Sequence, residues 1–109
     1  MPRLTRRTTL AALLAAPFAM LARPGHAETH AVTIEGFAYS PANLSVAAGD
    51  TVVFTNNDGA PHTATAGDGS FDTGRLNRGQ SAEVTVSAAG EIAYQCTFHP
   101  NMRGTITAS

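Results

Sequence analysis

The chain has no lysine and only one cysteine among its 109 residues. A single cysteine cannot form a disulfide within the chain, so Cys96 is a core residue, a reactive thiol or a metal ligand. Four of the seven arginines lie within the first 23 residues. The remainder carries three arginines and eight carboxylates, a formal charge of −5. This balance argues against a nucleic-acid-binding domain and against binding to an anionic membrane.

Long apolar runs are lacking too. The apolar stretch over residues 10–22 is interrupted by Pro17 and is too short to span a bilayer. It follows a basic start and precedes Gly25-His26-Ala27, which has the small residues of a signal-peptidase site. We therefore expect residues 1–27 to be a cleavable export signal, and a twin arginine in it suggests Tat export. Residues 28–109 would then form one domain without membrane insertion.

Helical periodicity is absent from the sequence after residue 27. Apolar and polar residues instead alternate with period two, and Gly, Pro, Asn and Asp interrupt the alternation at short intervals. This pattern is typical of an all-β sandwich or barrel. We expect strands at residues 31–35, 44–46, 51–56, 62–65, 81–86, 91–96 and 104–108.

Residues that can bind a metal gather after the expected strand at 91–96. Cys96, His99 and Met102 follow one another at three-residue intervals, so one turn can bring a thiolate, an imidazole and a thioether together. His62, 34 positions before Cys96, is the candidate for a second imidazole. Two histidines, a cysteine and a weak axial methionine are the ligands of a blue-copper electron-transfer site. Four protein ligands leave copper no open position for a substrate, so we expect no enzyme.

Other interpretations of these residues stay open at this point. A lone cysteine in a strand is usually a small core side chain, and a lone methionine usually fills a core. An exported copper carrier could hold Cu(I) with the same ligands. A fragment of a copper oxidase or nitrite reductase would need a second histidine cluster, and a structural zinc site would not favour methionine.

The ligand pattern resembles that of the cupredoxins, the plastocyanin and azurin superfamily, and especially of the amicyanins. The similarity lies in the spacing Cys96-x₂-His99-x₂-Met102 and in the stretch over residues 52–62. It covers residues 28–109 and implies a Greek-key β-sandwich with one type 1 copper ion at one end. It also implies a monomeric periplasmic carrier that exchanges single electrons with redox proteins, such as a dehydrogenase or a c-type cytochrome.

The resemblance also suggests roles for residues beside the ligands. Asp58 is expected to hold the second ring nitrogen of His62. Thr63 stands where many cupredoxins have an asparagine that ties the two ligand loops together, and its hydroxyl is the candidate for that link. Pro61 and Pro100 are the other residues expected to support the ligands, and proline stiffens a loop by fixing φ.

A docking surface is expected around His99, which corresponds to the histidine that serves as the electron port in the family. Its expected members are the apolar residues Phe98, Pro100, Ala60 and Pro61. His30 has no potential ligand near it in the sequence, so we expect it to be exposed to solvent.

Overall fold

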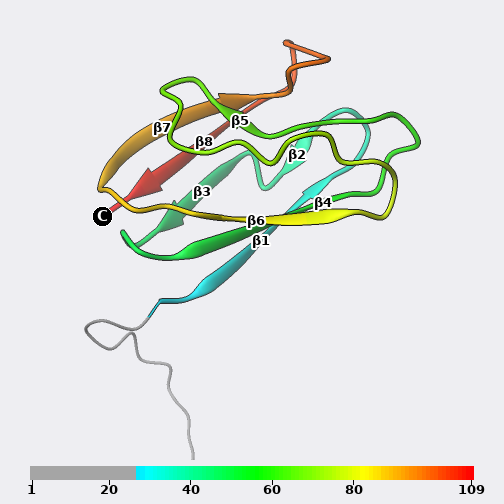
Figure 1. Cartoon of the computed structure of the whole chain (residues 1–109). Coiled ribbons are helices and arrows are strands. Elements are labelled where there is room, and N and C mark those ends of the chain that lie inside the picture. Colours follow the sequence, from blue (N-terminus) through cyan, green and yellow to red (C-terminus); the bar gives the residue numbers. More distant parts are fainter. Residues whose placement is uncertain (1–26) are drawn as a thin grey trace, which may run out of the picture.

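The computed structural model describes residues 27–109, which form two four-stranded sheets packed into a sandwich (Figure 1). The first sheet has the order β2-β1-β4-β6 and the second the order β3-β8-β7-β5. The strands are β1 Thr29–Ile34, β2 Tyr39–Ser40, β3 Asn43–Val46, β4 Thr51–Asn56, β5 Thr65–Ala66, β6 Ser81–Thr85, β7 Gly90–Gln95 and β8 Arg103–Ala108.

The period-two pattern predicted an all-β sandwich or barrel; the all-β class is confirmed, and the structure is a two-sheet sandwich. β1 pairs with β4 and β3 with β8 in parallel, whereas the other paired strands are antiparallel. The short strand expected at residues 62–65 is instead β5 at Thr65–Ala66, and His62 only forms an isolated bridge with Leu76. β2 was not expected, because two residues are too few to show an alternation. The expected signal at residues 1–27 lies, except for Ala27, outside the described residues.

Residues 27–109 contain no helix that is long and apolar enough to cross a bilayer.

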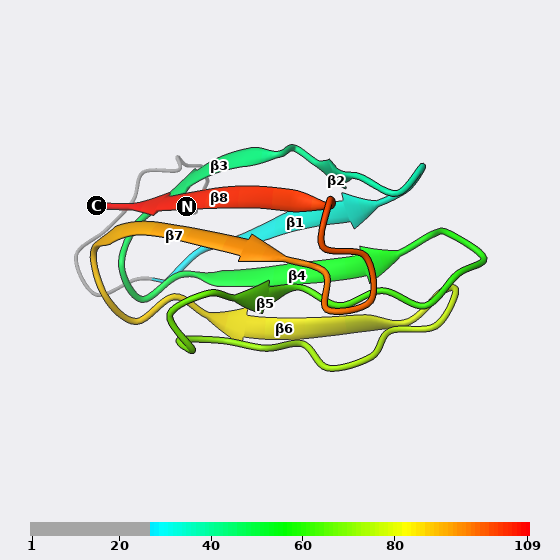
Figure 2. The same ribbon diagram turned by 90° about the horizontal axis from the view of Figure 1, so that it is seen from above.

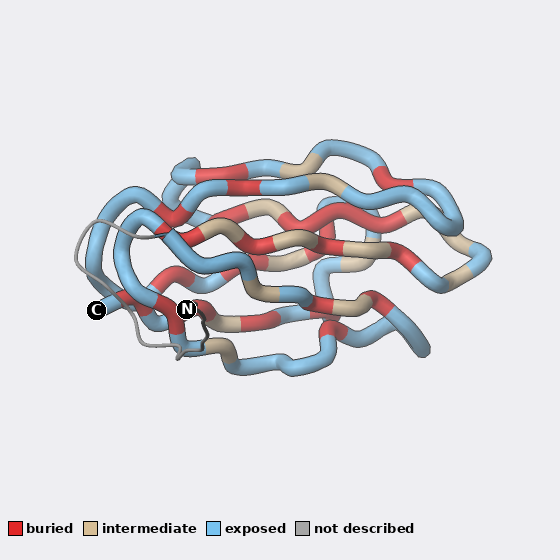
Figure 3. Tube along the Cα trace, turned by 90° about the horizontal axis from the view of Figure 1, so that it is seen from below, coloured by how far each residue is buried: buried red, intermediate tan, exposed pale blue. Residues whose placement is uncertain are grey.

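Burial alternates along the strands, as it must where one face of a strand meets the core and the other meets solvent (Figure 3). On β7, Ile92 and Tyr94 are buried, and Cys96 continues this inward face beyond the end of the strand. On β4, Val52 and Phe54 are buried together with Asn56. Asn56 is polar although the alternation along β4 places it on the inward face, where the other side chains are apolar. The inward faces of both strands therefore lead directly to the end of the sandwich that carries the candidate ligands.

Three connections gather at that end of the molecule. In Figure 2 the segment between β4 and β5 and the turn between β1 and β2 project at the right-hand end, and the loop between β7 and β8 lies at the right-hand ends of its two strands. β1, β4 and β7 run toward this end, so residues far apart in the sequence meet there. The sandwich thus brings the segments that contain Cys96, His99 and His62 to one place.

Candidate metal centre

The loop after β7 is closed by its own backbone. The Cys96 N–H donates to the Met102 carbonyl at 3.2 Å, and the Met102 N–H donates to the His99 carbonyl at 2.9 Å. Pro100 lies between His99 and Met102 in the chain and has no N–H that could pair in a strand. The loop therefore keeps Cys96, His99 and the buried Met102 within one short, hydrogen-bonded turn.

Asn56 organises the segment that carries His62. The Asn56 side chain is fully buried, and its Nδ2 donates to the carbonyls of Ala60 and Leu76 at 2.9 and 2.8 Å. The backbone of His62 in turn exchanges two hydrogen bonds with that of Leu76, at 3.0 and 2.8 Å. Because a buried amide must satisfy its donors, Asn56 fixes the path of the chain to His62.

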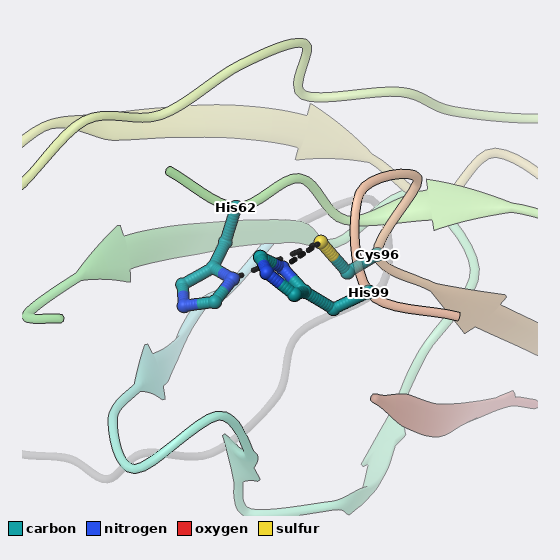
Figure 4. Close-up of side chains that lie close together, drawn as sticks. All are labelled: His62, Cys96 and His99. Atoms are coloured by element: carbon teal, nitrogen blue, oxygen red, sulfur yellow. Dashed lines mark hydrogen bonds between the residues drawn. The ribbon is translucent and has the colours of Figure 1, made fainter. Parts of the chain in front are cut away.

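Three of the four candidate ligands, His62, Cys96 and His99, converge (Figure 4). The Cys96 Sγ lies 3.7 Å from the His62 Nδ1 and 3.6 Å from the His99 Nδ1, and all three atoms lie within 4.8 Å of one another. His62 and Cys96 are fully buried, and His99 is half-buried. Met102, the fourth candidate, is buried in the same loop.

These separations fit ligands that share one metal ion. Bonds of about 2.3 Å to sulfur and about 2.0 Å to nitrogen at a tetrahedral angle place the two donors about 3.5 Å apart. A thiolate with two imidazoles and a thioether is a soft donor set that suits copper better than zinc. The donor set and its geometry are therefore typical of a type 1 copper site.

The carboxylate of Asp58 sets the orientation of the His62 ring. The His62 Nε2–H donates to Asp58 Oδ2 at 2.9 Å, so the lone pair of the imidazole is on Nδ1, the atom that faces Cys96. Burial opposes ionisation of Asp58, but the N–H groups of Phe37 and Gly36 and the His62 ring donate to it and lower its pKa. The sequence had suggested this contact with His62.

Thr63 joins the two ligand segments. Its backbone N–H donates to Cys96 Sγ at 3.4 Å, and its Oγ1 accepts a hydrogen bond from the Thr97 N–H at 2.9 Å. The hydroxyl thus makes a link of the kind considered from the sequence. Among the other residues expected to support the ligands, Pro61 is half-buried and Pro100 is exposed.

The expected docking residues surround the candidate ligands unevenly. Phe98 is 47% exposed and Pro100 is also exposed, whereas Ala60 and Pro61 are half-buried. Phe37, which the sequence did not single out, is 51% exposed and lies against both histidine rings. Its position could not be read from the sequence, because it depends on the turn between β1 and β2.

The expectation that His30 is exposed to solvent is wrong. The His30 Nε2 lies 2.9 Å from Asp50 Oδ2, and only 20% of the His30 side chain is exposed. Asp50 also accepts hydrogen bonds from the N–H groups of Glu28 and Ala47. Glu28, His30 and Asp50 lie close enough to hold a cation together. The Asp50 carboxylate, however, is already satisfied by the His30 ring and the two backbone N–H groups. We therefore assign this group a structural role.

Comparisons with known proteins agree with the donor set. The family model described as a cupredoxin-like domain matches residues 8–108. Amicyanin from Paracoccus versutus is 31% identical over 85 residues, which cover 73% of this chain and 64% of that protein. Plastocyanin A/B from Petroselinum crispum is 30% identical over 87 residues, which cover 68% of this chain and 90% of the plastocyanin.

The fold is shared as well. The solved structure of a purple cupredoxin from Nitrosopumilus maritimus aligns with a TM-score of 0.68 at 32% identity, covering 73% of this chain and 99% of that one. The matched region spans slightly less than two thirds of the amicyanin. Both relatives agree with the expectation, drawn from the ligands, that the chain is not an enzyme. The chain belongs to the cupredoxin family.

Proposed function

We propose that this chain is an exported carrier of single electrons in which His62, Cys96, His99 and Met102 bind one copper ion. The observation that carries the proposal is the convergence of the Cys96 thiol and the two Nδ1 atoms within 4.8 Å, at the end of a folded β-sandwich. Bound copper supplies the exchange of one electron. The protein residues would hold this site in nearly the same geometry before and after the exchange, which would keep the reorganisation small.

Each ligand has a distinct part in this proposal. The Cys96 thiolate couples the metal electronically to β7, and the hydrogen bond from the Thr63 N–H reduces the electron density on its sulfur. The thioether of Met102 would be a weak ligand that does not favour the harder Cu(II). His62 is buried behind the site, so His99, which is half-buried, provides the shorter path to the surface.

The proposal also covers the export of the protein, its compartment and its redox partners. Residues 1–27 would be a cleaved export signal, residues 28–109 a monomeric Greek-key domain, and the compartment the periplasm. Phe98, Pro100, Ala60 and Pro61 would form a small docking surface around His99, where a dehydrogenase or a c-type cytochrome binds transiently. The net acidic charge of residues 28–109 favours a partner with a basic rim around its own docking site.

A redox titration tests the function. The purified protein is loaded with Cu(II), reduced and reoxidised electrochemically, and its copper content is measured at each stage. An electron carrier shows a reversible one-electron transition and keeps its copper through repeated cycles. Copper that passes to a Cu(I) chelator on the first reduction would instead indicate a copper carrier and would refute electron transfer as the function.

A further inference from the structure

Phe37 is a large apolar residue at the surface in an unusual backbone conformation. It lies in the turn between β1 and β2 with φ = 57°, the left-handed region that non-glycine residues rarely adopt. Its side chain is 51% exposed. A conformation of this kind persists only where surrounding contacts hold it, so the contacts of Phe37 indicate its role.

The Phe37 ring meets both candidate histidine ligands. Its centroid lies 5.0 Å from that of His62 at an interplanar angle of 84°, and 4.9 Å from that of His99 at 88°. The two imidazoles are themselves 5.0 Å apart at 63°. These are favourable edge-to-face geometries, and together they make one packed group of three rings.

The carboxylate that holds His62 also holds the turn of Phe37. The Gly36 N–H donates to Asp58 Oδ1 at 2.8 Å, and the Phe37 N–H donates to Asp58 Oδ2 at 2.9 Å. Oδ2 is the same atom that accepts the His62 Nε2–H. The turn is closed by reciprocal hydrogen bonds between the backbones of Glu35 and Ala38. Asp58 thus fixes a ligand and the ring that covers it in a single arrangement.

We propose that Phe37 is a positioning residue that shields the His62 and His99 imidazoles and closes the copper site to water and small anions. This inference rests on the copper site proposed above. The ring restricts rotation of the half-buried His99 and covers the fully buried His62 from the solvent side. Phe98 is nearly as exposed but packs against neither ring in the aromatic contacts of residues 27–109, so it provides a matched comparison.

The test compares copper loss and anion binding in Phe37→Gly, Phe37→Tyr and Phe98→Ala. Glycine accommodates φ = 57° without strain and removes only the ring. We expect EDTA to bleach the visible band of the Cu(II)-loaded Phe37→Gly protein about tenfold faster than that of the wild type. We expect azide to change the spectrum of this variant alone. Phe37→Tyr and Phe98→Ala should stay within about twofold of the wild-type rate.

The outcomes separate this inference from the proposed function. A coloured Phe37→Gly protein with the wild-type bleaching rate and no response to azide would overturn the role of Phe37 alone. A wild-type protein that forms no visible band with Cu(II) would overturn the copper site and this inference with it. Should the glycine variant fail to fold, Phe37→Asn, which removes the ring and is better tolerated at φ = 57°, is judged by the same criteria.

Discussion

At the scale of single residues, Asp58 joins a candidate ligand to a distant turn through three hydrogen bonds. Its two oxygens accept from the His62 ring and from two backbone N–H groups of the turn between β1 and β2. Such a carboxylate fixes the tautomer and the orientation of a histidine that binds a metal. The local geometry of the site therefore depends on a residue that does not bind the metal.

Replacing Asp58 with asparagine should weaken copper binding. The amide oxygen can accept some of the three hydrogen bonds, but the amide nitrogen would face a donor. We expect the affinity for copper to fall about 10–100-fold, as measured by competition with a chelator of known affinity. Glu83→Gln on β6 removes an equal charge from an exposed position and is the control. Equal affinities of Asp58→Asn and Glu83→Gln would contradict the role of Asp58.

Sequence reasoning found the residues whose chemistry is unusual and missed those whose role is purely geometric. Cys96, His99 and Met102 are close in the chain, and their spacing alone placed them in one turn. Asn56 and Phe37 have common side chains, and their contacts depend on how distant segments meet. Asn56 did carry a signal, because it continues the inward face of Val52 and Phe54 and is nevertheless polar.

At the scale of the elements, the strands that alternate strongly were predicted within one or two residues. β1, β4, β6, β7 and β8 all fall in this class. β2 and β5 have two residues each, so they exist only because longer neighbouring strands offer them backbone partners. Two residues are too few to show an alternation, and the strand expected at residues 62–65 overlaps β5 only at Thr65.

The packing of β7 against β8 requires glycine at position 104. A Cβ at this position would overlap the ring and the hydroxyl of Tyr94, which is buried and cannot move aside freely. We expect Gly104→Ala to lower the free energy of unfolding by about 1–3 kcal/mol, measured by urea denaturation. Gly59→Ala, where no atom lies near the added Cβ, should stay near the wild type. Equal stability of both variants would contradict the close packing at Gly104.

Asp50 ties the start of β1 to the turn before β4, and acid should release this tie. Hydrogen bonds from the Glu28 N–H, the His30 ring and the Ala47 N–H lower the pKa of Asp50 to about 2. Since the folded-state pKa lies below the unfolded value, its contribution is present above pH 4 or so and is lost as the pH falls toward 2.

The stability of the copper-free protein should therefore decrease between about pH 4 and about pH 2, and less steeply in Asp50→Asn. Urea denaturation across this range measures the slope, and Glu91→Gln, at an exposed carboxylate of β7, serves as the control. If Asp50→Asn and Glu91→Gln lose stability with the same slope as the wild type, Asp50 does not act in this way.

At the scale of the whole molecule, the sandwich separates two polar clusters with different roles. The Asp50 cluster lies where β1 begins, and the candidate copper ligands lie at the end toward which β1, β4 and β7 run (Figure 2). The Asp50 cluster joins the start of β1 to the turn before β4, whereas the candidate copper ligands are positioned by loops at the opposite end. A continuous apolar core fills the sandwich between the two clusters.

The most direct test of the central claim is the visible absorption spectrum of the Cu(II)-loaded protein beside that of Cys96→Ser. A copper ion bound by the Cys96 thiolate and two imidazoles should give an intense thiolate-to-copper charge-transfer band, and the serine variant should lack it. A colourless wild-type protein, or a band of equal intensity in Cys96→Ser, would contradict the assignment of a type 1 copper site.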